Sequence, residues 1–531
     1  MDNKDLKYAI EYHEETKHSE IKLQMFRHYL DWDNRPRSFK VYLGLPSIPL
    51  PRDFPVPSSD ALACISGKHP FLPEAPLDSR TMAQLLFFSA GITREMKFDS
   101  GTYYMRAASA TGALYPIELY VVCQDIGGLQ AGVYHFSPGD FSLTQLRRGD
   151  FRPRLAEMAG GNQDILSSPV TLAFTSIAWR NAWKYGDRSY RHWFWDSGVI
   201  AANLLAAGAS AGLQPALVMG FADPAVNSLL CIEQGKEAAV ALAAISWPTK
   251  ADFDSKPDPT PVAIVPSPKI LLTSQVEVEL PEILRIHRAS SLATSDDVAQ
   301  WLGGKVNSDP KPRGRLQEHT HDSRQVTAGI GDVILSRGSS RRFSRYAISQ
   351  TQLSAILYSS TRGIPLDFLD KNASSVHIYF IANAVDGLAP GRYFYNRQSG
   401  SFQSLAPRSE TASRNESGYL CLGQPLFNDA SAVFFVMADL DANLKALGNR
   451  GYRACQFEAG VIAGKIYLSS YAQGLGASGS TFYDDAVTES FSPHARDKAA
   501  MIAVGVGMPA YKARPGKVLA ATLTKAQLLN Q

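Results

Sequence analysis

Cysteine is scarce in this chain. The five cysteines among 531 residues stand far apart, with no C-x-x-C pair and an odd total. This spacing excludes a disulfide framework and a cysteine-based zinc cluster, and it is typical of a reducing compartment. The first thirty residues carry charged side chains throughout and have no apolar core, which excludes a standard secretory signal. We therefore expect a cytoplasmic protein.

Long apolar runs and an excess of one charge are also missing. The most membrane-like stretch, residues 198–213, contains Asn203 and is shorter than the roughly 20 residues that span a bilayer. We predict a buried helix there and no membrane partner. The 53 basic and 50 acidic residues give a net charge of +3, which does not indicate a nucleic-acid partner.

The length predicts several domains, because one domain usually takes roughly 100 to 200 residues. The clearest break is the segment from Trp247 to Pro268, which interleaves prolines with Asp, Ser and Lys. We predict a linker at residues 251–285, with one domain at 1–250 and a second at 286–531.

The two halves repeat each other. Strand-like and motif blocks recur in the same order, with an offset that drifts slowly along the chain. Such an ordered set of matches indicates two copies of one domain. The matched positions are Ile92 and Ile364 (offset 272), Tyr120 and Tyr379 (259), Gly132 and Gly391 (259), Arg188 and Arg450 (262), and Gly212 and Gly474 (262).

Each copy is expected to have an α+β fold, because strand-like runs alternate with a long Ala-rich helix that is apolar all round. In the first copy we expect this helix to begin near Asp196, a good N-cap residue, and to stop at Gly212.

Three motif-like stretches are not expected to carry their usual chemistry. Residues 208–212 spell a nucleophile elbow but end a helix, and residues 474–479 spell a dinucleotide fingerprint but follow a helix and precede a strand. His13 and His18 are five residues apart, so they do not share a helix face as zinc ligands would. We expect a solvated N-terminal segment and no metal site.

Two other segments carry residues suited to ligand binding in one copy and lack them in the other. Around Arg337, Ser339 and Arg341 the sequence RGSSRRF gathers guanidinium and hydroxyl groups that suit a phosphate, although a solvated basic turn has the same pattern. In the first copy, SATGALYP from Ser109 carries small residues that let backbone N–H groups approach a flat ligand, although a plain turn would look alike. Each copy keeps the half that the other lacks.

These stretches resemble the FMN-dependent nitroreductase superfamily, and in particular its SagB-type branch, the dehydrogenases that oxidise azoline rings in peptides. The matching segments are YHEETKHS from Tyr12, LDWDNRP from Leu30, SATGALYPIELYVV from Ser109, KYGDRSYR from Lys184 and GFADPAVNSLL from Gly220, with RGSSRRF, RGYR and FYDDAV in the second copy. The resemblance covers nearly the whole chain apart from the linker and roughly residues 286–330. It implies two fused domains, each a mostly antiparallel sheet flanked by helices, that form a pseudo-dimer.

The resemblance also implies where the cofactor binds. FMN would lie at the interface between the copies, and a single complete site is expected. A cation near N1 and the C2 carbonyl of the flavin, either Arg337 or Arg341, would favour its reduction. The Lys512 and Arg514 pair would hold the phosphate, although a solvated tail is the alternative. The implied FMN-binding residues are Ser109, Ala110, Thr111, Gly112, Arg337, Ser339, Arg341, Gly479, Ser480, Thr481, Lys512 and Arg514.

The SagB-type branch resembles enzymes that use a Lys-Tyr pair as acid and base, and Lys184 and Tyr185 match that position. Their counterparts in the second copy are Ala446 and Leu447. Alternatively, Lys184 is a surface residue with Tyr185 packed beneath it. The arginines of RSYR and RGYR persist in both copies, so we predict a mainly structural role for them.

The leading hypothesis is an FMN-dependent oxidoreductase that acts on an azoline or a similar small or peptide substrate. One alternative is a nitroreductase or quinone reductase that uses NAD(P)H, and another is a flavin-binding scaffold without turnover. NAD(P)H or O2 is the expected electron partner. Because the fused copies replace the usual homodimer, either a monomer or a homo-oligomer is expected.

Overall fold

The computed structural model describes residues 2–25, 29–68, 77–99, 101–248, 268–304, 306, 328–370 and 373–530. The first part of the predicted linker, residues 251–267, lies outside this description, whereas residues 268–285 are described. The last five residues of the linker, 281–285, are helical, because they form the start of helix α10 (Pro281–Ala289). The helix begins with a proline, whose missing N–H costs no hydrogen bond in the first turn.

The first domain is built on a seven-stranded antiparallel sheet in the order β1-β6-β5-β4-β7-β9-β8. Its central strands are rich in Val, Ile and Ala and are buried on both faces. The strands are β1 (Ser47–Pro49), β4 (Ile117–Cys123), β5 (Gly132–Ser137), β6 (Ser142–Arg148), β7 (Val170–Ile177), β8 (Gln214–Val218) and β9 (Glu237–Ser246).

The second domain repeats this sheet with six strands in the order β14-β13-β11-β15-β17-β16, again antiparallel throughout. The matching order confirms the α+β fold and the internal repeat. The strands are β11 (Val376–Ala382), β13 (Gly391–Asn396), β14 (Ser401–Pro407), β15 (Ala432–Ala438), β16 (Gly476–Ser480) and β17 (Ala499–Gly507), with a small separate pair β10 (Ile348–Ser349) and β12 (Val385–Asp386).

One insertion distinguishes the first domain. A two-stranded hairpin, β2 (Ile92–Phe98) and β3 (Gly101–Arg106), stands between helix α4 (Ser79–Ala90) and the sheet. In the second domain the chain goes from α13 (Gln350–Ser360) to the sheet without a hairpin. The hairpin explains why the offset between the copies drops from 272 to 259 at this point.

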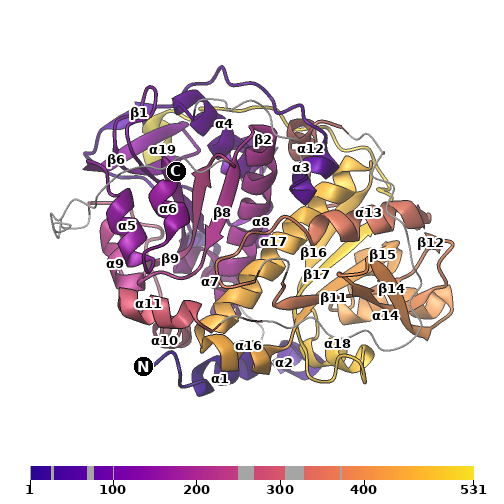
Figure 1. Ribbon diagram of the computed structural model, residues 1–531. Coiled ribbons are helices and arrows are strands. Elements are labelled where there is room, and N and C mark those ends of the chain that lie inside the picture. Colours follow the sequence, from indigo (N-terminus) through magenta and orange to yellow (C-terminus); the bar gives the residue numbers. More distant parts are fainter. Residues whose placement is uncertain are drawn as a thin grey trace.

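Two long helices, α8 (Ser189–Ser210) and α17 (Arg450–Ala472), lie side by side between the two sheets (Figure 1). Helix α8 starts before the predicted N-cap, so Asp196 lies inside the helix rather than at its end. The prediction of its start was therefore wrong, because the arginines and aromatic residues before Asp196 are buried by the neighbouring domain. The predicted end near Gly212 is close to the observed one.

Shorter helices cover the outer faces of both sheets (Figure 1). On the outer faces lie α5 (Arg152–Met158), α6 (Gln163–Ser167) and α9 (Asp223–Leu229) of the first domain, and α14 (Glu410–Leu420), α15 (Pro425–Asp429) and α18 (Asp484–Ser490) of the second. Helices α3 (Ala61–Ser66) and α12 (Ile330–Ser336) instead pack on α8 and α17 between the sheets. Helix α7 (Ala178–Tyr185) adjoins α8, α16 (Leu440–Leu447) adjoins α17, and α11 (Ser295–Leu302) follows α10. Within the described residues, no helix is long and apolar enough to cross a membrane.

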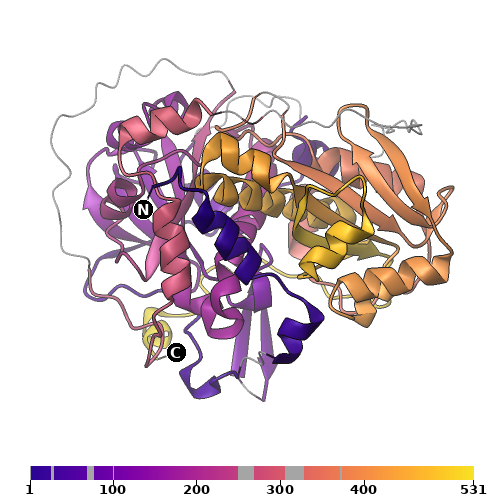
Figure 2. The same cartoon turned by 90° about the horizontal axis from the view of Figure 1, so that it is seen from below.

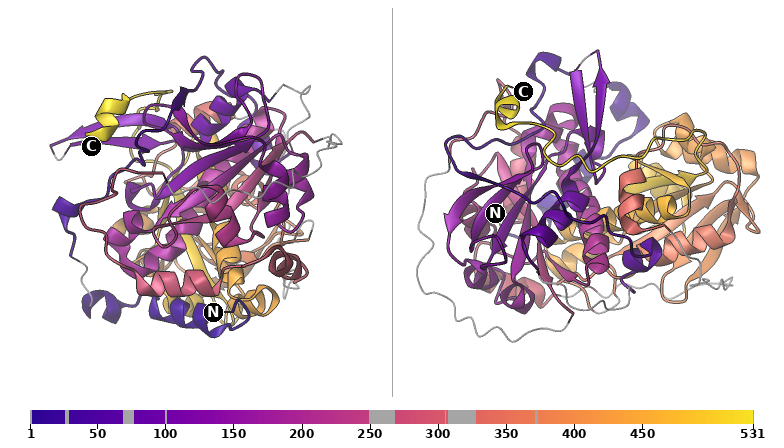
Figure 3. Two further views of the ribbon diagram at one scale, coloured as in Figure 1. Left: turned by 90° about the vertical axis from the view of Figure 1, so that its left-hand side faces the viewer. Right: turned by 90° about the horizontal axis from the view of Figure 1, so that it is seen from above.

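The two ends of the chain cross over to the opposite domain. The N-terminal helices α1 (Lys7–Glu15) and α2 (Glu20–Met25) lie beside the second domain (Figure 2), where Ala9 donates a backbone hydrogen bond to Asn449 (3.0 Å). The C-terminal arm runs back over the first domain (Figure 3, right) and ends in α19 (Lys525–Leu529). There Leu523 donates a backbone hydrogen bond to Gly139 (2.9 Å). The two domains are therefore tied together at both ends.

Buried ion pairs also cross the interface twice in a symmetric way. Asp484 of the second domain accepts from Arg188 (3.0 Å) and Arg191 (2.8 Å) of the first. Asp223 of the first domain accepts from Arg450 and Arg453 of the second, each at 2.6 Å. These pairs support the structural role predicted for the arginines of RSYR and RGYR.

The repeat extends into a region where the sequence did not reveal it. Helix α10 is the counterpart of α1 at an offset of 274, because Arg191 donates to the His13 carbonyl and Arg453 donates to the His287 carbonyl. The prediction of a solvated N-terminal segment was wrong at His13, which is buried beside Tyr452. Its burial follows from the packing of α1 on the other domain.

Candidate functional site

A large cavity of about 1730 Å³ opens between the two domains. Its lining combines α8 with the loop at residues 109–113 of the first domain, and α17 with residues 337–341 and 478–481 of the second. The β2–β3 hairpin and the C-terminal arm complete the rim. The SATGA segment of the first copy and the RGSSRRF segment of the second therefore border the same cavity.

Arg337 joins the two halves directly. It follows the last residue of α12, is buried, and lines the cavity. Its Nε donates to the Ala107 carbonyl (2.9 Å) and its Nη2 to the Arg106 carbonyl (3.0 Å), immediately before the SATGA loop. Burial lowers the pKa of Arg337, and no carboxylate forms an ion pair with it within the described ranges. A buried guanidinium with no acidic partner suits an anionic ligand.

The SATGA loop is tied to helix α8. Thr111 donates from its backbone N (2.9 Å) and its Oγ1 (2.8 Å) to Asp196 Oδ1. Gly112 has a φ of +64° and packs against Tyr185, where an added Cβ would stand 2.6 Å from the phenol oxygen. Glycine is therefore required here both for the backbone conformation and for the close approach. Ser109, Ala110, Thr111 and Gly112 all line the cavity, and their binding of FMN stays a prediction.

Lys184 and Tyr185 stand together at the end of α7, and both line the cavity. The Lys184 Nζ lies 5.4 Å from the centre of the Tyr185 ring. Burial, together with the charge of Asp196, raises the pKa of Tyr185 to about 12. The phenol therefore keeps its proton at neutral pH and can donate it in a hydrogen bond. Their position fits the predicted pair, and their catalytic role stays a prediction.

The segment Gly479–Thr481 also borders the cavity, but one of its groups is already engaged. The Gly479 N–H donates to the Tyr467 hydroxyl of α17, which also lies 3.4 Å from the Ser339 hydroxyl. Tyr467 thus connects the two cavity segments of the second domain. The sequence analysis missed this residue, although its counterpart at offset 262 is Leu205, a polar-for-apolar difference that could have revealed it.

Cationic side chains gather around Arg337. Arg341 and Arg514, two of the predicted FMN-binding residues, line the cavity together with Lys517 and Arg94. The Arg94 Nη2 donates to the carbonyls of α12 residues Leu335 (3.2 Å) and Ser336 (3.0 Å). Lys512 is exposed and does not line the cavity, although its neighbours Tyr511 and Ala513 do. The role assigned to Lys512 stays a prediction, and Lys517 is a further cation on the lining.

Two histidines at the other end of the cavity were also missed. His18 and His192 both line it, and their counterparts in the second copy are Leu292 and Ala454. Burial, together with Arg188, lowers the pKa of His18 to about 3 and holds the pKa of His192 well below its usual range. Both rings are therefore neutral hydrogen-bonding groups. His192 lies beside Tyr185, with 4.8 Å between the ring centres, and His18 Nδ1 lies 3.2 Å from the Thr481 hydroxyl.

The corresponding position on the other side of the pseudo-twofold axis is closed. Leu217, the counterpart of Gly479, pairs with Leu366 in a parallel bridge, and its N–H donates to the Pro365 carbonyl (2.8 Å). Trp301 fills the space beside this bridge and donates to the Leu447 carbonyl (2.9 Å), at the counterpart of Tyr185. Backbone pairing and an indole thus occupy the place where the first side has open space.

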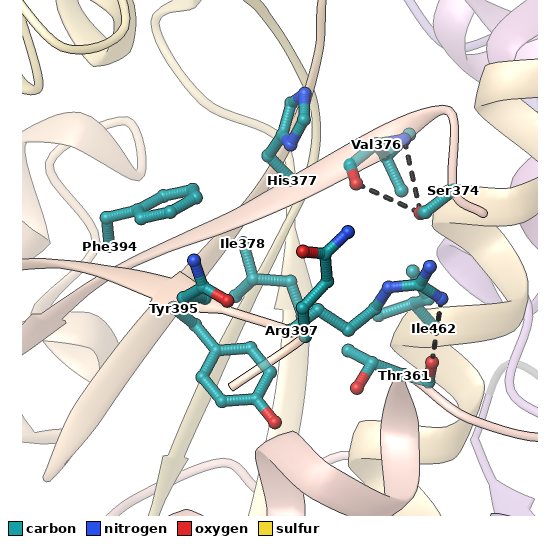
Figure 4. A pocket seen from close by; sticks show the side chains of 11 residues that line it. Thr361, Ser374, Val376, His377, Ile378, Phe394, Tyr395, Arg397 and Ile462 are labelled. Carbon is teal, nitrogen blue, oxygen red and sulfur yellow. Dashed lines mark hydrogen bonds between the residues drawn. The ribbon is translucent and has the colours of Figure 1, made fainter. Parts of the chain in front are cut away.

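Close to this side, the second domain holds a small pocket of about 20 Å³, room for a single water molecule (Figure 4). Its walls include Ser374, whose hydroxyl accepts from the Val376 N–H (3.3 Å), and Arg397, which donates to the Thr361 carbonyl (3.3 Å). This pocket cannot take a flavin. In the part of the chain that is described, no three His, Cys, Asp or Glu side chains are grouped to hold a metal ion.

The architecture defines a two-domain α+β protein with one cavity between its copies. The nitroreductase family model matches residues 70–247 and 334–508, so the chain belongs to the nitroreductase family in both halves. The sequence prediction of this family and of its tandem arrangement is confirmed.

Individual relatives agree with this assignment. A crystal structure assigned as a nitroreductase of Anabaena variabilis has a TM-score of 0.71 and 26% identity, with 94% of this chain and 99% of that chain covered. A protein of Methanocaldococcus jannaschii, also assigned as a nitroreductase, is 29% identical over 160 residues, which are 30% of this chain and 77% of that protein. The trifolitoxin-processing protein TfxB of Rhizobium leguminosarum bv. trifolii is 30% identical over 203 residues, 37% of this chain and 54% of TfxB.

Proposed function

We propose that the protein is an FMN-dependent oxidoreductase of the SagB type, which oxidises an azoline or a similar small C–N or C–S unit in a peptide or small molecule. The observation that carries the proposal is the contact of Arg337 with the carbonyls of Arg106 and Ala107, because it brings both half-sites to one cavity. The similarity to TfxB, whose name describes the processing of trifolitoxin, supports a peptide substrate.

The cavity fits FMN in charge and in shape. Arg337 has no acidic partner within the described ranges, and the Arg94 Nε is buried without a hydrogen-bond partner there, so both guanidiniums are available to a phosphate dianion. Ser339, Arg341, Arg514 and Lys517 add further donors on the same lining. Gly112 and the small residues beside it leave a flat approach for the ring system.

When bound, FMN supplies the acceptor for the two electrons that leave the oxidised bond. Positive charge beside the ring system favours the reduced form, and Arg341 on the same lining is the candidate for it once Arg337 serves the phosphate. The Tyr185 phenol holds a proton beside the substrate end of the cavity, and Lys184 is the candidate base that takes a proton from the substrate carbon. The buried α8–α17 wall keeps bulk water away from this end.

One FMN per chain is expected, because Leu366 and Trp301 close the second position. The fused copies also satisfy internally the interface that a dimer would otherwise supply, so we propose a monomer as the active unit.

The decisive test counts FMN per chain from the visible spectrum of the purified protein. We expect one, and we expect R337Q and S109W to remove it separately, while the exposed, non-lining Arg342 serves as the matched control in R342Q. A count of two, or normal FMN content in S109W, would refute the cross-domain site. A count of zero after FMN reconstitution would refute FMN binding altogether, whereas one bound FMN without turnover would favour the flavin-binding scaffold.

The reaction is tested with an azoline-containing peptide, whose oxidation removes two hydrogen atoms and is seen by mass spectrometry. Consumption of NAD(P)H with a nitroarene, without azoline oxidation, would instead support the nitroreductase reading.

A further inference from the structure

Asp196 holds the SATGA loop from inside helix α8. It is buried, it lines the cavity, and it accepts both donors of Thr111 together with the Asn181 Nδ2 (3.4 Å). No cation lies within ion-pair distance of it in the described segments. Its negative charge is therefore stabilised by hydrogen bonds alone, in a place where burial is costly for a charge.

The second copy has an equivalent buried carboxylate, which lies on the closed side. Glu458 stands 262 residues later and accepts from the Ser375 N (2.8 Å) and the Ser374 Oγ (2.6 Å), in the loop before β11. Both copies thus use an acid of the long helix to tie the loop that precedes the first central strand. Only Asp196 faces the large cavity, so Glu458 is a natural control for it.

Among the ionisable groups around it, Asp196 is the one whose pKa lies near neutral pH. Burial raises the pKa of Asp196 to about 7, and the bonds from Thr111 and Asn181 only partly oppose this. Raised pKa values keep Tyr185 of α7 and Tyr467 of α17 neutral, and a lowered pKa keeps His192 of α8 neutral. The cations on the same lining are Lys184 of α7, Arg188 at the start of α8, and Arg337 with Arg94 from the opposite wall.

We propose that Asp196 is a positioning residue that sets the flavin-binding loop and couples FMN binding to the uptake of one proton. The inference rests on the proposed function, because it needs FMN in this cavity. A bound FMN removes the remaining water from the cavity side of the carboxylate and adds a phosphate charge of the same sign. Both effects favour the protonated acid, so the complex takes up a proton from solvent and the affinity falls as the pH rises.

The test measures the FMN dissociation constant of the apoprotein by flavin fluorescence from pH 6 to pH 9. For the wild type we expect about a tenfold loss of affinity over this range, relative to D196N measured in parallel, since one unit of linked pKa change is a factor of ten. Asn keeps an acceptor for Thr111 but cannot take up the proton. Comparing the two proteins also cancels the titration of the FMN phosphate itself.

The control E458Q should show the wild-type pH dependence, because Glu458 belongs to the closed side. Calorimetry at pH 8 in two buffers with different ionisation enthalpies should detect proton uptake in the wild type and none in D196N. T111V, which removes one donor to the carboxylate, should move the loss of affinity to higher pH, and it serves as the test if D196N does not fold.

Parallel affinity curves for the wild type and D196N would overturn the inference and leave the proposed function intact. Absence of FMN binding by the wild type at every pH would overturn both. Loss of the pH dependence in E458Q would show that the effect does not belong to Asp196.

Discussion

Gly198 of α8 and Gly460 of α17 meet where the two helices cross, and they stand at the repeat offset of 262 from each other. A Cβ on Gly198 would lie 2.6 Å from the Val461 N, and a Cβ on Gly460 would lie 2.7 Å from the Trp195 carbonyl oxygen. The two backbones therefore touch, and the pseudo-twofold axis passes close to this contact. The same crossing brings Asp196 and Tyr467 to opposite walls of one cavity.

Alanine at the crossing should destabilise the protein. We expect G460A to lower the free energy of unfolding by about 1–3 kcal/mol, because the added methyl group overpacks a backbone contact. Urea denaturation followed by circular dichroism measures this. G303A is the matched control, since Gly303 has a right-handed φ of −70° and its Cβ would stand 3.2 Å from the Gln300 carbonyl oxygen, a contact that a small shift relieves.

The crossed ion pairs predict sensitivity to acid. Burial alone would raise the pKa of Asp223, but Arg450 and Arg453 lower it to about 2. A lowered carboxylate pKa stabilises the fold above the unfolded value of about 4, and this stability is lost as the pH falls toward 2. Removing the charge leaves two buried guanidiniums unpaired, so D223N should cost about 3–5 kcal/mol at pH 7.

Denaturant unfolding at pH 7 and pH 3 tests this, and the gap between D223N and the wild type should shrink at the lower pH. D441N removes an exposed ion pair with Lys445 and should leave both curves unchanged. An equal gap at both pH values would show that Asp223 is not held ionised by its two arginines.

Tyr467 should matter for FMN affinity more than for stability. Y467F removes the hydroxyl that accepts from Gly479 and contacts Ser339, so we expect about a tenfold weaker affinity, the value of a hydrogen bond of about 1–1.5 kcal/mol. Fluorescence titration with FMN measures it. Y471F is the control, because Tyr471 lines the same cavity and its hydroxyl has no hydrogen bond to the described residues. Equal losses in both variants would contradict a specific role for Tyr467.

The indole that closes the second position should be structural. W301A removes a buried side chain and should lower the free energy of unfolding by about 3–5 kcal/mol, with the FMN count still one per chain. W32A, at an indole that is 62% exposed, is the control and should have a much smaller effect. A second FMN in W301A would mean that Trp301 alone blocks the other side, and that the bridge between Leu217 and Leu366 does not contribute.

His192 should affect substrate turnover without affecting FMN content. The counterpart of His192 in the second copy is Ala454, so the substitution H192A introduces the residue that the second copy already has at the equivalent position. We expect FMN occupancy to be unchanged and kcat/KM with an azoline peptide to fall about tenfold, the loss of one hydrogen bond to the substrate. H377A is the control, at a buried histidine of the second domain that lines only the small pocket of Figure 4. Unchanged kcat/KM would remove His192 from the substrate end.

Much of the architecture could be predicted from the sequence, because a repeated domain leaves its order of strands and turns in the chain twice. The offset pattern identified two copies, and the small residues of SATGA and the arginines of RGSSRRF identified two complementary half-sites. These are local signals, since they depend on residues that are close together in the chain. The extension of the repeat into α10 was missed because helices α1 and α10 keep few identical residues and share mainly their contacts with Arg191 and Arg453.

The sequence by itself determined the α+β class, the duplication, and which residue types each half-site offers. Only the tertiary structure decided which residues meet, because the cavity forms between segments that are hundreds of residues apart. The fold placed Arg337 on the carbonyls of Arg106 and Ala107, brought Lys517 to the cavity lining, and put Asp196 inside a helix rather than at its end. It also closed the second position. There the buried indole of Trp301 and the backbone bridge between Leu217 and Leu366 fill the space that is open on the first side.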